Sequence, residues 1–249
     1  MDTRLKEFTE NFENNPLGLD DTFQFSCRMC GKCCKNRHDI MLTTRDLYNI
    51  AKYFGRSMRY VVERYCVVYT GEISRVPIVR LQPSGPEQAC PLLRDKRCVV
   101  HASKPVVCAL FPLGRGIFTP SAEDGSELPD EFKPIYVAQP VTCGKQDQIH
   151  TVRDWLEQFG IPVEDEFYIL WTKAVTTLSD IFCRMVEMEI TDKPEGFLRN
   201  VAYSALYINY ETDKDLMPQF RDSMADLNKI FTKARLDIEK FIGGAQNGE

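Results

Sequence analysis

The chain has 249 residues, 43% of them hydrophobic and 27% charged, and a net charge of −5 at pH 7. This length can bury a core without disulfide bonds and allows one large domain or two small ones. An acidic chain lacks the basic character of most nucleic-acid-binding domains, and no stretch approaches the roughly 18 apolar residues that span a bilayer. Nucleic acid and membrane are therefore excluded as expected partners.

The ten cysteines are unevenly distributed, with nine before residue 145 and one in the last hundred residues. The first ten residues contain no apolar core like that of a signal peptide, so we expect a cytoplasmic protein. In a reducing compartment, clustered cysteines indicate metal or redox chemistry rather than structural disulfides. The shift in cysteine content predicts a cysteine-cluster metal-binding domain over residues 1–148 and a second domain over residues 149–249.

The first cysteine group is the dense motif C-R-M-C-G-K-C-C at residues 27–34. Its two-residue spacers let Cys27, Cys30 and Cys33 converge on one centre, because the chain curls around the ion. Thiolates repel each other, so four of them in such a short segment need a cation to hold them together. The side chains of the adjacent Cys33 and Cys34 are expected to diverge. They would then serve two neighbouring centres, or one of them would only pack beside the site.

The segment after this motif is predicted to form short elements. Residues 43–54 have the pattern of a helix that begins at a threonine cap and ends at Gly55. A second helix follows Ser57, and we interpret Cys66 as a packing residue on it. Short strands are predicted over residues 76–82, 97–100 and 134–141.

A second cysteine group consists of Cys90, Cys98, Cys108 and Cys143. It contains no C-x-x-C knuckle, so it is poorly suited to hold an ion alone. Prolines at positions 91, 105 and 112 stiffen the chain beside three of these residues. We therefore expect the second group to close onto the same metal region as the first. His101, three residues after Cys98, is interpreted as a capping or packing residue rather than a ligand.

Together, the C-x-x-C-x-x-C-C motif and the block C-P-L-L…C-x-V-H-x-x-K-P-x-x-C-x-x-F-P resemble the YkgJ-like cysteine-cluster family. The resemblance covers roughly residues 25–145. His101 stands where an aromatic residue is expected, and Lys104 where arginine is common. The resemblance implies a zinc- or iron-chelating domain. Its implied metal ligands are Cys27, Cys30, Cys33, Cys34, Cys90, Cys98, Cys108 and Cys143.

The spacing of the cysteines favours an iron–sulfur cluster over zinc. Three cysteines as C-x-x-C-x-x-C with a distant fourth match the pattern used for a [4Fe–4S] cluster. A zinc ribbon usually brings two C-x-x-C knuckles together, and the second knuckle is missing here. Zinc remains the alternative cofactor. The nearby basic residues Arg28, Lys32, Lys35 and Arg37 are interpreted as a solvated rim that offsets thiolate charge.

The rest of the chain is predicted to be helical. Residues 121–130 read as an exposed acidic loop, and residues 243–249 as a disordered tail. Helices are expected over residues 152–159, 164–189, 195–209 and 215–241, with Cys183 as a packing residue on the second of these. The predicted fold class is α-rich with short irregular strands: a metal-bound cysteine-cluster domain followed by a helical domain.

The sequence indicates a cytoplasmic metal-binding cysteine-cluster protein that binds an iron–sulfur cluster. The metal would be structural, would be redox-active or would support a protein-modification reaction. One alternative is a zinc-stabilised adaptor that binds a protein partner through its helical domain. Another is a protein-modifying enzyme, because the cysteine signature also looks like part of the flagellin lysine methylase family. The chain has no recognisable S-adenosylmethionine-binding loop, Walker loop or nucleophile elbow. The sequence therefore identifies no catalytic residue and leaves open whether the protein is an enzyme.

Overall fold

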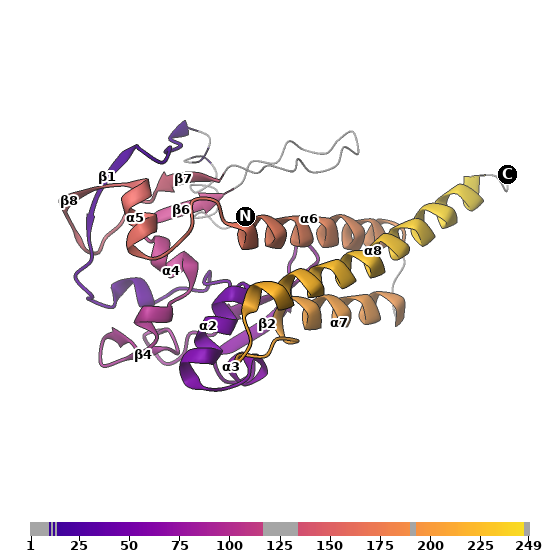
Figure 1. Ribbon diagram of the computed structural model, residues 1–249, viewed down its shortest axis with the longest axis horizontal. Coiled ribbons are helices and arrows are strands. Elements are labelled where there is room, and N and C mark those ends of the chain that lie inside the picture. Colours follow the sequence, from indigo (N-terminus) through magenta and orange to yellow (C-terminus); the bar gives the residue numbers. More distant parts are fainter. Residues whose placement is uncertain (1–9, 11, 13, 117–133, 190–192, 247–249) are drawn as a thin grey trace. The chain divides into compact units, whose positions relative to one another are not determined.

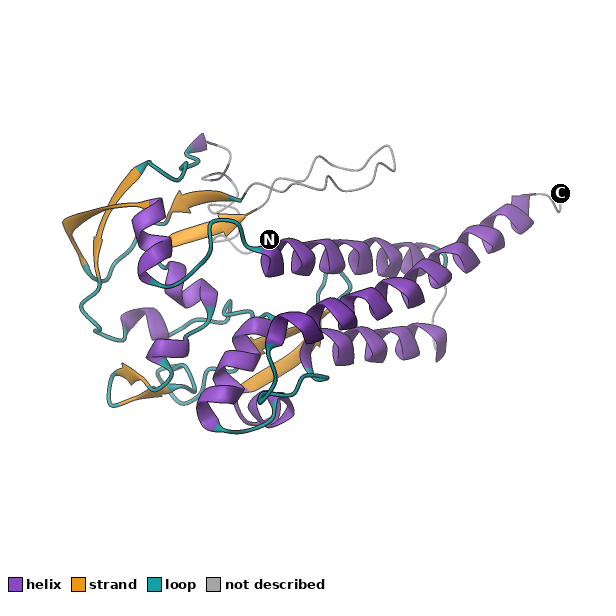
Figure 2. Ribbon diagram, in the orientation of Figure 1, coloured by secondary structure: helices purple, strands orange, loops and turns teal. Residues whose placement is uncertain are grey.

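The computed structural model describes residues 10, 12, 14–116, 134–189 and 193–246, with side chains described to residue 236 except at 193 and 194 (Figure 1). Helices predominate, and the strands form small two-stranded sheets (Figure 2). The predicted α-rich class with short strands is confirmed at this level. The acidic segment 121–130 lies outside the described residues. In the described part of the chain, no helix is both long and apolar enough to cross a membrane.

The chain divides into two compact units that do not follow a single boundary in the sequence. The first contains residues 1–40 and 83–169, and the second contains residues 41–82 and 170–249. The predicted boundary at residue 148 falls inside the first unit. Residues 41–82 group with the C-terminal helices because their helix and strand pack against one of those helices. The Thr44 hydroxyl, for example, donates a hydrogen bond to the Leu206 carbonyl at 2.5 Å.

The first unit is organised around a sheet of β1 (Thr22–Ser26) and β8 (Lys145–Thr151), which are antiparallel. Alternation along β1 turns Phe23 and Phe25 into the core, where both rings contact Trp155 edge to face. Trp155 lies on α5 (Val152–Gln158), and its indole N–H donates to the Leu110 carbonyl at 3.0 Å. These contacts fix the strand end at which the cysteine motif begins.

Two further strand pairs and a short helix belong to the first unit. A second sheet pairs β6 (Leu113–Gly116) with β7 (Ile135–Ala138), and a small hairpin pairs β4 (Leu93–Arg94) with β5 (Arg97–Cys98). The helix α4 (Val106–Leu110) leads into β6. The strand predicted over residues 134–141 therefore exists, but the one predicted over residues 97–100 is limited to two residues.

The second unit begins with the helix pair α2 (Thr44–Phe54) and α3 (Met58–Tyr65). Both helix starts follow the prediction, since Thr43 and Ser57 accept N-cap hydrogen bonds from the third residue of each helix. A hairpin of β2 (Cys66–Thr70) and β3 (Pro77–Leu81) follows. Cys66 was expected on the helix, and this is wrong. The β-branched and aromatic run after it favours a strand, which pairs with β3.

Three long helices form the remainder of the second unit: α6 (Glu166–Glu187), α7 (Lys193–Tyr207) and α8 (Leu216–Gln246). The first turn of α6 belongs to the first unit. Phe182 on α6 and Phe231 on α8 meet edge to face at 5.7 Å. The predicted helices agree with these three within a few residues. The tail was expected to be disordered from residue 243, but α8 continues to Gln246.

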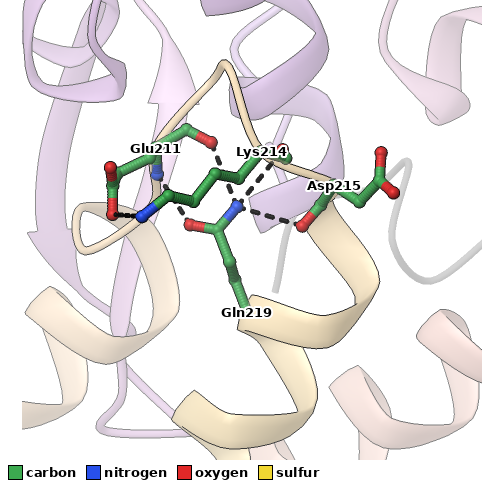
Figure 3. A network of polar contacts seen from close by, with 4 residues as sticks. All are labelled: Glu211, Lys214, Asp215 and Gln219. Carbon is green, nitrogen blue, oxygen red and sulfur yellow. Dashed lines mark hydrogen bonds and ion pairs between the residues drawn. The ribbon is translucent and has the colours of Figure 1, made fainter.

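A hydrogen-bond network closes the turn between α7 and α8 (Figure 3). The Gln219 amide donates to the carbonyl oxygens of Glu211, Lys214 and Asp215, and its oxygen accepts from the Glu211 N–H at 2.8 Å. The Lys214 ammonium adds an ion pair with the Glu211 carboxylate at 2.6 Å. One side chain thus satisfies several backbone groups that precede the helix.

We expect Gln219→Ala to lower the free energy of unfolding by about 1–2 kcal/mol, because it leaves several backbone groups without their partner. Lys214→Ala is the matched control in the same turn. Its ion pair is exposed and screened by solvent, so its removal should have a much smaller effect. Urea unfolding of both variants measures the difference. Equal losses in the two variants would contradict this account of the turn.

Candidate metal centre

The two compact units separate the cysteines into two classes. Cys66 and Cys183 lie in the second unit, and none of the ten cysteines, all of which are among the described residues, is in a disulfide bond. The first unit contains the eight that the family resemblance singled out: Cys27, Cys30, Cys33, Cys34, Cys90, Cys98, Cys108 and Cys143. The sorting of the cysteines therefore agrees with the compact units.

The C-x-x-C-x-x-C-C loop leaves the end of β1 and closes in a 3₁₀ turn, η1 (Lys32–Cys34). Cys27 and Cys30 are exposed, whereas Cys33 and Cys34 are half-buried. Gly31 turns the chain with φ of 72°, and a Cβ there would lie 3.4 Å from the Lys96 carbonyl oxygen. The loop thus rests closely on the β4–β5 turn.

Cys143 is held beside the start of this loop. Ser26 pairs with Lys145 across the β1–β8 sheet, so Cys27 follows β1 at the end where Cys143 precedes β8. Gly144 makes the approach possible, because a Cβ at this position would lie 2.7 Å from the Ser26 carbonyl oxygen. Asp147 reinforces the junction by accepting hydrogen bonds from the Ser26 hydroxyl and, at 2.8 Å, from the Arg28 guanidinium.

Cys90 is joined to the other end of the loop by backbone hydrogen bonds. The Cys90 N–H donates to the Cys34 carbonyl at 2.8 Å, and the Asn36 N–H donates to the Gln88 carbonyl at 3.0 Å. An ion pair between Lys35 and Glu87 at 2.7 Å lies next to these bonds. Cys90 and Cys143 therefore lie beside the two ends of the C-x-x-C-x-x-C-C loop, and the convergence of both cysteine groups on one metal region stays a prediction.

Cys98 and Cys108 follow on short rigid elements. Cys98 ends the β4–β5 hairpin, where it pairs with Leu93, whose N–H donates to the Cys90 carbonyl at 3.0 Å. Cys108 lies in the first turn of α4, and its N–H donates to the Pro105 carbonyl at 2.8 Å. Both cysteines are thus positioned by local backbone hydrogen bonds.

The sulfur atoms of Cys33 and Cys34 lie 4.0 Å apart. Their side chains were expected to diverge, and this is wrong, because the 3₁₀ turn brings them to the same side of the chain. The hydrogen bond with Cys34 lowers the pKa of Cys33 to about 6. The same bond, together with burial, raises the pKa of Cys34. The pair therefore favours one thiolate stabilised by one thiol.

The other shifted thiols have a raised pKa. Burial is the largest cause at Cys90, Cys98 and Cys143, and it raises the pKa of Cys143 to about 11. Negative charge on neighbouring cysteines adds to the increase at all three. A site of this kind resists full ionisation by itself, whereas a bound cation reverses that preference.

Two cationic side chains face the cysteines. Arg37 acts electrostatically on Cys33 and Cys108 while it pairs with Asp39 at 2.6 Å. Lys104, with its ammonium 4.0 Å from the centre of the Phe159 ring, acts on Cys33 and Cys98. Arg37 was expected in a solvated rim but is half-buried. The sequence did not indicate this role of Lys104, because the residue lies far along the chain from the first motif.

The remaining candidates lie at the edge of the region. His101 and His38 are exposed. Burial and the charge of Lys104 lower the pKa of His101, so the ring stays neutral. His150 is half-buried between Phe23 and Trp155. Among the described residues, no three Cys, His, Asp or Glu side chains are close enough as they stand to hold a single metal ion.

The two cysteines of the second unit provide matched controls for metal binding. Cys66 starts β2, and the Cys183 thiol faces the Ile73 carbonyl at 3.4 Å. We expect Cys66→Ala and Cys183→Ala to keep the full metal content and to cost about 1–2 kcal/mol as small packing losses. Elemental analysis and urea unfolding of the purified variants measure both quantities. Loss of metal from either variant would contradict the assignment of these residues to packing.

One comparison with known proteins bears on this region. Residues 26–144 match a family model described as CxxCxxCC, putative zinc- or iron-chelating domain. No curated protein and no solved structure showed significant similarity to the chain. The matched segment begins one residue before Cys27 and ends one residue after Cys143. It therefore contains all eight clustered cysteines.

Proposed function

Because residues 26–144 match the CxxCxxCC family model, described as a putative zinc- or iron-chelating domain, we propose that this protein binds an iron–sulfur cluster through cysteines of its first unit. The observation that carries the proposal is the position of Cys143. This residue lies far along the chain from C-x-x-C-x-x-C, yet the β1–β8 pairing holds it at the start of that motif. The result is the three-plus-one arrangement of ligands that suits a [4Fe–4S] cluster.

We divide the eight cysteines into two sets of four that meet at Cys33 and Cys34, whose sulfur atoms lie 4.0 Å apart. Cys33 also acts electrostatically on Cys34, Cys90 and Cys98, so the two sets adjoin. Cys143 interacts electrostatically with Cys27, Cys30 and Cys33, which together form the first set. Cys34 interacts with Cys90 and Cys108, and Cys90 interacts with Cys98. These four form the second set. The first set would hold the [4Fe–4S] cluster, and the second would hold a neighbouring metal centre or support the first.

The chain's own residues would bind the cluster and tune its environment. A [4Fe–4S] cluster supplies one-electron chemistry, with a potential set by charge, hydrogen bonds and exposure. Arg37 and Lys104 would offset the negative charge of the thiolates, and the exposed Cys27 and Cys30 would leave one side open to a partner. Ten cysteines outside disulfide bonds, all among the described residues, suit a reducing, cytoplasmic compartment.

Zinc is the second candidate, and one distance favours it. Tetrahedral zinc with Zn–S bonds of about 2.3 Å places neighbouring sulfur atoms about 3.8 Å apart. The 4.0 Å between the sulfurs of Cys33 and Cys34 is close to that spacing. Under this alternative both residues bind one ion, and the metal stabilises the fold without transferring electrons.

Metal and acid-labile sulfide analysis of anaerobically purified protein distinguishes the candidates. The iron–sulfur proposal predicts a brown protein with about four irons and about four sulfides per cluster. A colourless protein that contains zinc and no sulfide would contradict it and support the second candidate.

A further inference from the structure

The helix pair of the second unit carries a continuous surface of aromatic rings and one guanidinium group. Tyr53 meets Phe54 at 5.3 Å, Phe54 stacks on Tyr65 at 5.5 Å, and Tyr65 meets Tyr60 at 6.5 Å. Arg56 completes the series, with its guanidinium 5.7 Å from the centre of the Tyr60 ring. We call these five residues the aromatic–arginine surface. They come from α2, α3 and the turn between them.

Much of this surface is open to solvent. Tyr53 is 51% exposed and Tyr60 is 40% exposed, although α2 and α3 have buried faces that are fully packed. Large aromatic side chains are costly to leave in water, so a contiguous exposed group of them indicates a binding surface. Tyr, Trp and Arg are also the residues that most often dominate the energy of protein interfaces.

The segment that carries this surface is basic, although the whole chain is acidic. Residues 41–82 contain seven Lys or Arg and three Asp or Glu, whereas the whole chain has a net charge of −5. Lys52, Arg56, Arg59 and Arg64 are all exposed on α2, α3 or their connecting turn. Four exposed positive charges thus lie on the same helix pair as the exposed tyrosines, against one exposed carboxylate, that of Glu63 on α3, so the net positive charge would attract carboxylates.

We propose that the aromatic–arginine surface binds an acidic segment of a partner protein, with carboxylates on Arg56 and Arg59 and an apolar side chain against Tyr53 and Tyr60. This role is separate from metal binding and uses none of the clustered cysteines. The occupant is a protein segment rather than nucleic acid because of the ring geometry. Tyr53 and Tyr60 stand at 81° and 79° to their neighbours, and Arg56 lies over one face of Tyr60. They do not form the row of open faces on which successive bases stack.

Fluorescence anisotropy with the full-length, metal-loaded protein tests this proposal. Three labelled probes are compared: a peptide rich in Asp, Glu and Leu, the same peptide with Asn and Gln in place of the acids, and single-stranded oligothymidylate. The acidic peptide should bind most tightly and weaken as salt is raised. Arg56→Glu, Arg59→Glu and Tyr60→Ala should each weaken it by about tenfold or more.

Lys233→Glu is the matched charge reversal, because Lys233 is exposed on α8. It should leave the affinity for the acidic peptide unchanged. Circular dichroism and metal content check that each variant is folded, and Arg56→Gln replaces Arg56→Glu if the reversal unfolds the protein. Three results would overturn the proposal: no binding or equal binding of the acidic and neutral peptides, equal weakening by Lys233→Glu, or tighter binding of oligothymidylate.

Discussion

Serine in place of Cys27, Cys30, Cys33 or Cys143 is expected to remove most of the metal from anaerobically isolated protein and to reduce its soluble yield. A serine hydroxyl stays protonated at neutral pH and is a poor ligand for iron or zinc, so each change deletes one of four ligands. The free energy of metal binding also stabilises the fold, since the thiolates of an empty site repel one another. Iron, zinc and sulfide content of the purified variants measures the effect.

Cys183→Ser provides the control, because it makes the same chemical change in the second unit and should retain metal. The four ligand variants should lose metal to a similar degree if they belong to one centre. Full metal content in all four would refute the proposed ligand set. Loss in the three cysteines of the motif but not at Cys143 would refute the pairing of Cys143 with them.

A single methyl group at Gly144 is expected to disrupt the junction that holds Cys143. In Gly144→Ala, the added Cβ would lie 2.4 Å from a ring carbon of Phe25 and 2.7 Å from the Ser26 carbonyl oxygen. Phe25 is buried in the core and Ser26 contributes backbone atoms, so neither can yield cheaply. The backbone also has φ of 74°, which disfavours residues with a Cβ. We expect a loss of about 3–5 kcal/mol from overpacking and strain together.

Gly85→Ala separates the two contributions. Gly85 has φ of 73°, but its added Cβ would meet no atom within 4 Å. It should therefore cost only about 1 kcal/mol, the penalty of the backbone conformation. Gly144→Ala should in addition lose metal, because it moves Cys143 away from Cys27. Urea unfolding and metal analysis of both variants measure these effects, and equal behaviour of the two would contradict the proposed role of Gly144.

The longer helices could be predicted from the sequence because their signals are local, whereas the five-residue helix α4 was not predicted. The N-caps at Thr43, Ser57 and Thr151 each receive the hydrogen bond that the sequence indicates. The strand β1 was not predicted, although the alternation of Phe23 and Phe25 with polar residues is a strand signal. The strand β8 could not be predicted, because its sequence Lys145–Thr151 is mostly polar and its strand structure comes with pairing to β1. The grouping of residues 41–82 with the C-terminal helices also depends on packing between distant segments, which sequence periodicity does not encode.

The candidate site, like the fold, could be predicted from the sequence only in part. Spacing alone singled out Cys27, Cys30 and Cys33, because their geometry is set within one short loop. The position of Cys143 depends on the register between β1 and β8, and that of Cys90 on its hydrogen bond to Cys34. The contribution of Lys104 likewise follows from the tertiary structure. The close approach of Cys33 and Cys34 results from a 3₁₀ turn for which the sequence gives no clear signal.

X-ray absorption spectroscopy of the anaerobically purified protein, at the iron and zinc edges, tests most directly whether cysteine thiolates bind a metal here. The proposal predicts iron that has sulfur as its only neighbouring ligand and that shows scattering from further iron atoms. Bound metal surrounded by oxygen or nitrogen, or protein that carries no stoichiometric iron or zinc, would contradict the proposed thiolate centre.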